Sequence, residues 1–316
     1  MNSNLPLVSV VTPAYNQGMF LRDTIETVLN QDYPNIELIV LNDGSTDDTE
    51  AILKEYTGRI YWETQKNMGQ TPTINKGWKL SKGEIITWLN SDDTYYPGAV
   101  REGVEYLLAH PETGIVFADS MFTEADGTPI ERTRPVPPFN YVDFVKNCEN
   151  PISQPSSFIR RSVMEKAGEL DPKFYYFMDW DFWLRAGLYC KIDHVDAIWS
   201  TYRLHAESKT VSQSKRAAPE LLYMYDKYFG RNDLPSEILE NKKEAMMNMY
   251  FTSGGYYLQG EDFDSSAMCA KKAMSINPSG WFSPKSLHKY FYCKYGNSKA
   301  YKSLRVVFGK TKKANA

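Results

Sequence analysis

The sequence has few cysteines and no long hydrophobic run, and both absences limit what the chain can be. Its four cysteines are widely spaced and form neither a Cys-x-x-Cys pair nor a Cys/His ligand pattern, which argues against a zinc site or a disulfide framework. No window approaches the roughly 18 consecutive apolar residues of a membrane span. The N-terminal residues lack a signal peptide's basic region and cleavage site, and Asn-x-Ser/Thr sequons are absent. We therefore expect a cytoplasmic protein.

Two nucleotide-binding signatures are also missing. The sequence contains no Gly-x-Gly-x-x-Gly, which dinucleotide-dependent oxidoreductases use, and no Gly-x-x-x-x-Gly-Lys-Ser/Thr, which P-loop hydrolases need. These absences argue against both classes of enzyme.

Acidic residues are absent from the end of an otherwise acidic chain. The formal net charge is -3, yet residues 281–316 contain nine Lys or Arg, no Asp or Glu, and many aromatic residues. This tail favours an anionic membrane surface as partner over nucleic acid. The alternative is a helix that packs on the body through its rings and leaves its lysines solvated.

From Leu7 to about Phe122, short β-branched runs alternate with segments of helical periodicity. Expected strands are residues 8–12, 36–41, 59–63, 84–89 and 114–119. Helices should fill the gaps, because the Ser-Thr-Asp-Asp run at 45–48 offers a helix N-cap and Tyr-Pro-Gly at 96–98 opens another helical segment. This alternation predicts an α/β fold with a mostly parallel sheet flanked by helices.

The chain changes character twice after this region. Residues 127–155 are rich in Pro and Asn and are expected to connect to a second half of the same domain. After His205 the patterns are helical only, over residues 219–229, 237–258 and 263–277. We therefore expect an α/β domain over residues 1–210 and an α-helical C-terminal region over residues 211–316.

Acidic side chains follow two of the expected strands. Asp43 stands after the second strand, where ligands bind in an open parallel sheet, so it could accept a hydrogen bond from a base or a ribose; a helix-capping turn is the alternative. Asp92 and Asp93 follow the fourth strand. Adjacent carboxylates repel unless a cation compensates, and hard oxygen ligands suit Mg²⁺ or Mn²⁺ carrying a diphosphate. A surface Asp-Asp turn is the alternative here.

A third acidic site opens an expected helix at Met-Asp-Trp-Asp, residues 178–181. Asp179 and Asp181 are two residues apart and cannot share a helix face, so only one should face a cleft. Aromatic neighbours could desolvate that carboxylate and raise its pKa towards that of a general base. The alternative is an acidic residue favoured at a helix N-terminus by the helix dipole.

Taken together, these segments resemble glycosyltransferase family 2 of the GT-A fold. The similarity is dense over about residues 6–120, which include VSVVTPAYNQ to GSTDDT at 8–49 and NMGQT to LNSDD at 67–93. It resumes in ISQPSSFIRRSVMEKAGELDPKF, MDWDFWLR and YRLHAESKT, up to about residue 210. The ordered occurrence of these segments is far more specific than any one of them. The resemblance implies a Rossmann-like sheet and sugar transfer from a nucleotide-sugar donor with Mn²⁺ or Mg²⁺ as cofactor.

The resemblance also assigns roles to residues. Those expected to bind the nucleotide-sugar are Thr12, Pro13, Ala14, Tyr15, Asp43, Asn67, Gly69, Ser91 and Asp92. Within this set Tyr15 and Asp43 would contact the base and Asp92 the ribose. Asp93 would bind the metal on the diphosphate, and Asp179 would be the catalytic base. His205 stands where family members bring a polar group towards the diphosphate or metal, although a lone His is often a surface residue.

One departure concerns the residue before Asp179, which is often Glu in this family and is Met178 here. A catalytically silent nucleotide-sugar-binding or scaffold protein is therefore an alternative to an enzyme. The Gln-x-x-Arg-Trp motif and the membrane spans of processive synthases are absent, which favours transfer of one or a few sugars.

The resemblance implies an inverting enzyme that uses UDP ahead of dTDP or GDP. Its acceptor would be a glycan or a lipid-linked glycan, in bacterial surface polysaccharide or lipid-linked oligosaccharide synthesis. Peripheral contact with the inner face of the cytoplasmic membrane fits such an acceptor.

Overall fold

The computed structural model describes residues 5–133, 138–205 and 214–298. The chain divides into two compact units. Unit 1 comprises residues 1–141 and 150–208, and unit 2 comprises residues 142–149 and 209–316. A short segment, 142–149, thus belongs with the C-terminal helices although the chain on both sides of it belongs to unit 1.

Unit 1 is built on one eight-stranded sheet. Seven strands follow the order β3-β2-β1-β4-β7-β5-β6, and β8 pairs with β5. The strands are β1 (Val8–Ala14), β2 (Ile36–Asn42), β3 (Tyr61–Thr64), β4 (Ile85–Trp88), β5 (Thr113–Thr123), β6 (Pro129–Arg132), β7 (Ser157–Arg160) and β8 (Lys191–Arg203). Strands β1 to β4 are parallel, and β7 is antiparallel to both β4 and β5. The carboxyl ends of β1, β2 and β4 therefore meet at one edge of the sheet.

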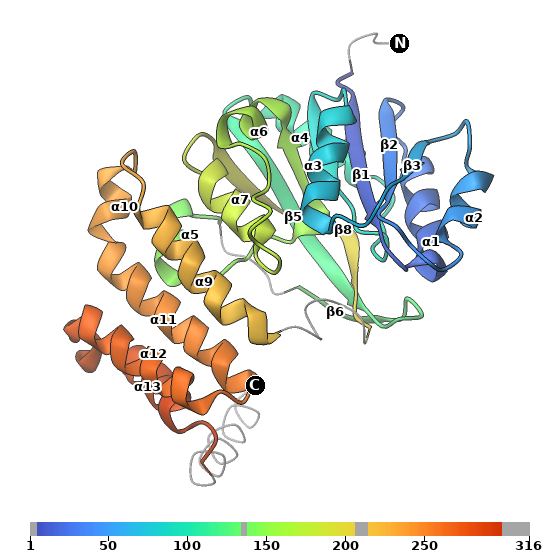
Figure 1. Cartoon of the computed structure of the whole chain (residues 1–316). Coiled ribbons are helices and arrows are strands. Elements are labelled where there is room, and N and C mark those ends of the chain that lie inside the picture. The colour runs from blue at the N-terminus through green and yellow to red at the C-terminus, as the bar shows by residue number, and fades with distance from the viewer. Residues whose placement is uncertain (1–4, 134–137, 206–213, 299–316) are drawn as a thin grey trace. The chain divides into compact units, whose positions relative to one another are not determined.

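Helices cover both faces of this sheet. They are α1 (Gly18–Leu29), α2 (Thr49–Glu55), α3 (Gln70–Leu80), α4 (Ala99–Ala109), α6 (Arg161–Ala167) and α7 (Met178–Ala186), with a 3₁₀ turn η1 (Gln154–Ser156). Buried side chains of α1, α2 and α4 form one core with alternate strand residues such as Val10 and Val40. Helices α3 and α7 lie on the other face, in front of the sheet in Figure 1, where Trp88 of β4 contacts Trp78 and Trp183.

The α/β fold class predicted from the sequence is confirmed, and the structure refines its elements. Each expected strand occurs, with β5 extending to Thr123 rather than ending at residue 119. The segment 127–155, expected as an irregular connection, contains β6 and helix α5 (Tyr141–Asn147). The polar composition of the segment gave no strand signal at β6, because β6 is an exposed strand of four residues.

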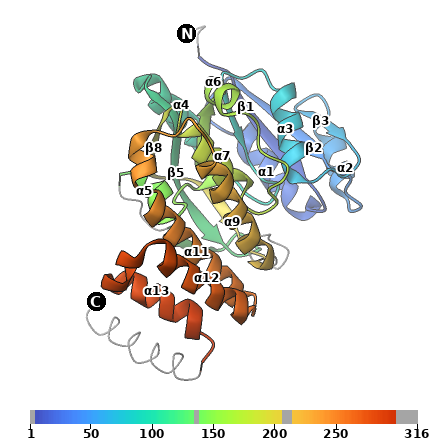
Figure 2. The ribbon, with the colours of Figure 1, turned by 60° about the vertical axis from the view of Figure 1, so that its left-hand side comes forward.

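Unit 2 consists of helices among the described residues. They are α9 (Ser214–Phe229), α10 (Ser236–Glu240), α11 (Lys242–Gln259), α12 (Phe263–Ile276), the 3₁₀ turn η2 (Pro278–Phe282) and α13 (Pro284–Tyr295). Helix α11 packs against α9 and α12, and α13 packs against α12 (Figure 2). The helix expected over 237–258 is broken at Asn241. Segment 142–149 is tied to this unit because the Tyr225 hydroxyl donates to the Val145 carbonyl (2.9 Å).

The expected C-terminal tail is partly a structural element. Tyr290 and Cys293 of α13 are buried in a core with Met247, Phe251 and Met274. The packed-helix alternative therefore holds for one face of α13. The part of the tail at residues 299–316 lies outside the described residues.

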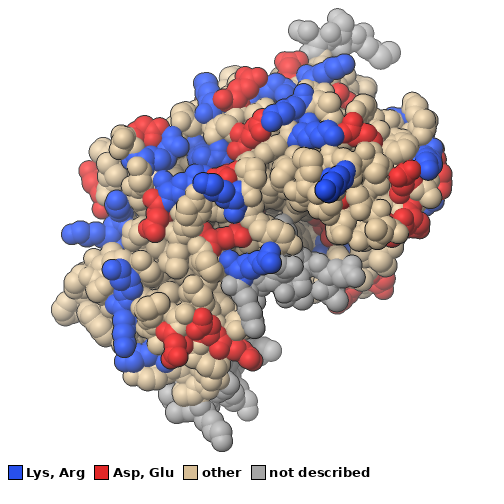
Figure 3. Space-filling model, viewed as in Figure 1, with Lys and Arg blue, Asp and Glu red and all other residues tan. Residues whose placement is uncertain are grey.

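No helix in the described ranges is both long enough and apolar enough to span a bilayer. On the molecular face drawn in Figure 3, basic and acidic side chains intermingle.

Candidate functional site

The first predicted site residues lie at the end of β1. Thr12, Pro13 and Ala14 are buried in this central strand, and the Thr12 hydroxyl has no hydrogen-bond partner in the described part of the chain. Tyr15, the next residue, is 50% exposed. Its ring is thus the only large side chain of this group available to stack on a ligand from this strand end.

The carboxylate of Asp43 holds the loop that leads into α3. Asp43 lies directly after β2 and is buried. Its Oδ1 accepts hydrogen bonds from the Gln65 amide (2.8 Å) and the Met68 backbone N–H (2.9 Å), and its Oδ2 accepts from the Gly69 N–H (2.8 Å). A carboxylate offers about four acceptor positions. Among the described residues, one acceptor position on Oδ2 therefore has no donor.

Two further contacts fix this loop. The Lys76 ammonium donates to Gln65 Oε1 (2.9 Å), so the amide nitrogen of Gln65 is turned towards Asp43. A Cβ atom at Gly44 would lie 2.9 Å from the Asn67 backbone nitrogen, and Gly44 has a φ of +78°. Only glycine fits such a close approach in this backbone conformation. Asn67 is consequently held beside the end of β2, with its side chain exposed.

Asp92 is the more open of the two adjacent carboxylates. Its Oδ2 accepts from the Gln17 amide (2.9 Å) and lies 3.0 Å from His205 Nε2. The amide oxygen of Gln17 accepts a hydrogen bond from the Ser91 hydroxyl. Oδ1 of Asp92 accepts no hydrogen bond from the described residues. Gln17 and His205 therefore orient the carboxylate and leave one oxygen for a ligand.

Asp93 is buried and its oxygens are occupied. Oδ1 accepts from the Arg203 backbone N–H (3.0 Å) and Oδ2 from the Asn90 amide (3.3 Å). Burial, and after it the neighbouring Asp92 charge, raise the pKa of Asp93 well above its ordinary value, against the two hydrogen bonds. By its hydrogen bonds, Asp92 rather than Asp93 has an oxygen without a donor among the described residues, whereas the family resemblance implies the metal ligand at Asp93.

Arg203 joins β8 to this turn. Its Nε donates to the Asp92 carbonyl (2.9 Å) and a terminal nitrogen to the Ala125 carbonyl (2.7 Å). The guanidinium also lies 4.7 Å from the Phe20 ring centroid, and Phe20 in turn contacts the His205 ring. Arg203 thus fixes the strand end from which His205 projects.

Neutral amides surround Asn90. Its side chain accepts from Gln70 at the start of α3 (2.8 Å) and lies 3.4 Å from Gln154 Oε1. Gln154 is anchored because its nitrogen donates to the Trp88 carbonyl (2.7 Å). This cluster links β4, α3 and the η1 turn at the edge of the sheet where Asp92 lies.

Asp179 and Asp181 have different surroundings at the start of α7. Asp181 is buried and accepts from Arg185 (2.8 Å), whose other nitrogens donate to carbonyls at residues 167–169. Asp179 is partly exposed. The sulfur of Met178, at the position that is often Glu in the family, accepts from the Thr71 hydroxyl (2.9 Å). Thr71 follows Gln70, so the start of α7 lies beside the amide cluster.

The Asp92 and His205 pair fits a divalent cation in part. The described residues contain no group of three His, Cys, Asp or Glu side chains that could hold a metal. A carboxylate oxygen and an imidazole nitrogen 3.0 Å apart could supply two ligands, and Mg²⁺-type sites commonly take the rest from substrate phosphates and water. The residues present therefore suit a cation that arrives with a diphosphate.

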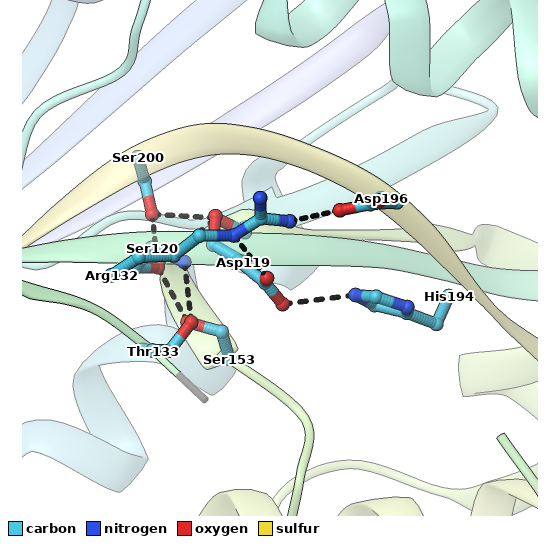
Figure 4. A network of polar contacts seen from close by, with 9 residues as sticks. Asp119, Ser120, Arg132, Thr133, Ser153, His194, Asp196 and Ser200 are labelled. Atoms are coloured by element: carbon cyan, nitrogen blue, oxygen red, sulfur yellow. Dashed lines mark hydrogen bonds and ion pairs between the residues drawn. The ribbon is translucent and has the colours of Figure 1, made fainter. Parts of the chain in front are cut away.

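A second polar network lies between β5 and β8 (Figure 4). The buried Asp119 carboxylate lies 2.9 Å from His194 Nε2 and accepts from Arg132 of β6 (2.5 Å). Next to it, the Ser120 hydroxyl lies 2.5 Å from that of Ser153 and 2.6 Å from that of Ser200. Ser153 precedes Gln154. The network thus holds the segment that carries Gln154 against the sheet.

Sequence reasoning missed Gln17, Gln65, Gln70, Asn90, Gln154 and Arg203. An amide or a guanidinium has no spacing signature of its own, because its role depends on which strand ends the fold brings together. Their one available signal is position, since all six fall within or beside the segments that carry the family resemblance.

Comparisons of sequence give a consistent picture. Residues 9–168 match the model of glycosyl transferase family 2. An uncharacterized glycosyltransferase from Rickettsia felis is 30% identical over 222 residues, 67% of this chain and 37% of that protein. The putative teichuronic acid biosynthesis glycosyltransferase TuaG from Bacillus subtilis is 32% identical over 147 residues, 45% of this chain and 58% of that protein. The chain spans about a third of the length of the first curated relatives it matches.

Comparisons of structure support the same fold. The crystal structure of S. aureus TarS in complex with UDP-GlcNAc has a TM-score of 0.69 at 14% identity and covers 93% of this chain and 92% of that chain. The mannosyltransferase PcManGT from Pyrobaculum calidifontis, in complex with GDP-Man and Mn²⁺, has a TM-score of 0.60 at 15% identity. It covers 96% of this chain and 84% of that chain. Likeness at this identity concerns the fold.

Proposed function

The chain belongs to glycosyl transferase family 2, and we propose that it is an inverting, non-processive glycosyltransferase that moves a sugar from a nucleotide-sugar to an acceptor hydroxyl. The observation that carries this proposal is the pairing of Asp92 with His205 at the carboxyl edge of the parallel strands. Ligands bind at this edge in open α/β sheets. We assign the catalytic domain to residues 1–210 and the helical C-terminal region to residues 211–316.

The donor nucleotide binds across the ends of β1, β2 and β4. Tyr15 stacks on the base, and the remaining acceptor position of Asp43 Oδ2 takes a base N–H. Asn67 and Gly69 approach the donor through the loop that Asp43 holds. Ser91 and Gln17 keep Asp92 in place. UDP is the favoured nucleotide, and the solved neighbours contain both UDP-GlcNAc and GDP-Man.

Asp92 and His205 would hold Mn²⁺ or Mg²⁺, while Asp93 stabilises the turn. When bound, such a cation neutralises charge on the departing diphosphate. This assignment predicts that replacing Asp92 by a neutral residue weakens donor binding more than replacing Asp93 does.

Asp179 takes the proton from the acceptor hydroxyl. As the acceptor oxygen forms its bond to the anomeric carbon, the bond from that carbon to the diphosphate breaks, and the electron pair leaves with the nucleoside diphosphate. Attack from the face opposite the leaving group inverts the anomeric configuration. A positioned base of this kind contributes a factor of about 10²–10⁴ to the rate.

The acceptor we propose is a glycan or a lipid-linked glycan in bacterial surface polysaccharide synthesis, a setting consistent with the name of the relative TuaG. A lipid-linked acceptor would bring the protein to the inner face of the cytoplasmic membrane as a peripheral partner. We propose no nucleic-acid partner.

A donor screen tests this function. The protein is incubated with UDP-, dTDP- and GDP-sugars with Mn²⁺, with Mg²⁺ or with EDTA, and released nucleoside diphosphate is measured. We expect metal-dependent release from at least one donor. Binding of a donor without any release, in the presence of glycan acceptors, would favour the silent binding protein instead.

A further inference from the structure

Helix α13 presents aromatic side chains on two opposite faces. On its inner face Tyr290 and Cys293 are buried against α11 and α12. On its outer face Phe291 and Tyr295 are 46% and 44% exposed. Exposed aromatic side chains that gather on one face of a helix mark an interaction surface.

The exposed residues of α13 form one stripe. Positions 284, 288, 291 and 295 are exposed and follow one another at intervals of four, three and four residues, which places them on one side of a helix. The turn η2, directly before the helix, has two more exposed rings, Trp281 at 46% and Phe282 at 90%. Trp281 is connected to the stripe because its ring contacts Tyr290, which in turn contacts Phe291. We name Trp281, Phe282, Phe291 and Tyr295 the aromatic surface of α13.

Lysines flank this surface. Lys285 is exposed one position after the start of the stripe, and the Lys294 ammonium lies 5.0 Å from the Tyr295 ring centroid. Lys289 differs because its ammonium is directed inward and donates to Asn248 (3.2 Å). Neither Asp nor Glu occurs anywhere from residue 265 to the end of the chain. The charges that α13 itself carries beside the aromatic surface are therefore positive only.

We propose that the aromatic surface of α13, with Lys285 and Lys294, docks on a bilayer that contains anionic lipid. Tyr and Trp rings prefer the headgroup level of a bilayer, and flanking lysines are attracted to anionic headgroups. In a dimer formed through this surface, the lysines of one copy would face the same lysines of the other. Residues 299–316 would bring six more cations and no carboxylate. Charge complementarity therefore favours anionic lipid over both of these occupants.

This inference rests on the proposed function, in which a lipid-linked acceptor draws the enzyme to a membrane. The residues involved all belong to unit 2, whereas the donor site belongs to unit 1. Donor binding and membrane binding can therefore fail independently, and both are measured on the same samples.

The test is co-sedimentation of the full chain with vesicles of phosphatidylcholine alone or mixed with phosphatidylglycerol. The test variants are Trp281→Ser with Phe282→Ser, and Lys285→Glu. Met268→Ser is the matched control, because Met268 is 64% exposed on α12 and lies outside the surface. All four changed side chains are exposed, so folding should be retained, and a UDP thermal shift in each variant verifies the donor site.

We expect the wild type to bind the mixed vesicles and to release at high salt. Each test variant should bind about tenfold more weakly, and Met268→Ser should bind as the wild type does. Failure of the wild type to bind mixed vesicles at low salt would overturn the proposal. So would equal losses in test variants and control, or self-association in solution that the Trp281 and Phe282 substitutions abolish.

A deletion of residues 299–316 separates the surface from the tail. Removing residues from 281 onwards would also remove Tyr290 and Cys293 from the core, so the cut is made after Ser298. The shortened chain should still bind mixed vesicles in a manner that depends on Trp281 and Phe282. Complete loss of binding in the shortened chain would assign the membrane contact to the tail and contradict the proposal.

Discussion

His205 Nε2 lies 3.0 Å from Asp92 Oδ2, although 113 positions separate the two residues in the sequence. The contact arises because the end of β8 returns to the turn after β4, where Arg203 donates to the Asp92 carbonyl. The proposed cation site is thus formed by two distant segments that one arginine holds together.

The first prediction distinguishes the roles of the adjacent carboxylates Asp92 and Asp93. Asp92→Asn should remove most of the Mn²⁺ assistance to UDP binding, because the variant loses the charge of the carboxylate that we propose as a cation ligand. Asp93→Asn should retain most of it, since the oxygens of Asp93 are turned to Arg203 and Asn90. Calorimetric titration of UDP with Mn²⁺ and with EDTA measures both. A larger loss in Asp93→Asn would restore the roles expected from the sequence.

A second prediction concerns the pH dependence of stability. Because the folded-state pKa of Asp93 is raised, its contribution to stability is fully present below the ordinary Asp pKa and is lost as pH rises through the raised value. Asp93→Asn lacks this titration. As pH rises from acidic to neutral, the free energy of unfolding of the variant should therefore increase relative to that of the wild type. Urea unfolding at several pH values measures this difference. A constant difference across this range would contradict the raised pKa.

The pair at the start of α7 gives a third prediction. Asp179→Asn should lower sugar transfer by about 10²–10⁴ and leave donor affinity within a few-fold, because the amide cannot take a proton. Asp181→Asn should instead lower the free energy of unfolding by about 1–3 kcal/mol, since it weakens a buried pair with Arg185. Transfer rates and thermal unfolding distinguish them. Equal transfer losses at equal stability would refute the choice of base.

A fourth prediction treats Arg203 as a positioning residue. Arg203→Lys keeps the charge but loses the forked contacts to the carbonyls of Asp92 and Ala125. It should weaken Mn²⁺-assisted UDP binding while UDP binding in EDTA changes little. Asp23→Ala, which removes only the outer 3.4 Å contact to the same guanidinium, is the control and should behave as the wild type. Equal losses with and without Mn²⁺ would indicate a general structural role.

The fold was predictable because its signals are local. The buried β-branched run at residues 36–41 specifies a strand, and the Ser-Thr-Asp-Asp run at 45–48 marks the start of α2 at Thr49, although the Asp48 side chain makes no capping hydrogen bond. The site was predictable in outline for a similar reason, since Asp43 directly follows β2, Asp92 lies in the turn after β4, and parallel strands end at one edge.

The division of roles within the site was not predictable. Asp92 and Asp93 are chemically identical neighbours, and only the return of β8 makes one buried and leaves the other open. The same limit applies to α13, where Tyr290 and Phe291 are adjacent in the sequence but the first is buried and the second exposed. Which ring packs inward depends on α11 and α12.

The central claim is that this chain cleaves a nucleotide-sugar at the site formed by Asp92 and His205. The most direct measurement is nucleoside diphosphate release from UDP-, dTDP- and GDP-sugars with Mn²⁺, for the wild type and for Asp92→Asn. We predict release from at least one donor by the wild type and a fall of about 10² or more in the variant. Release at equal rates by both proteins, or failure of the wild type to bind or cleave any donor, would contradict the account.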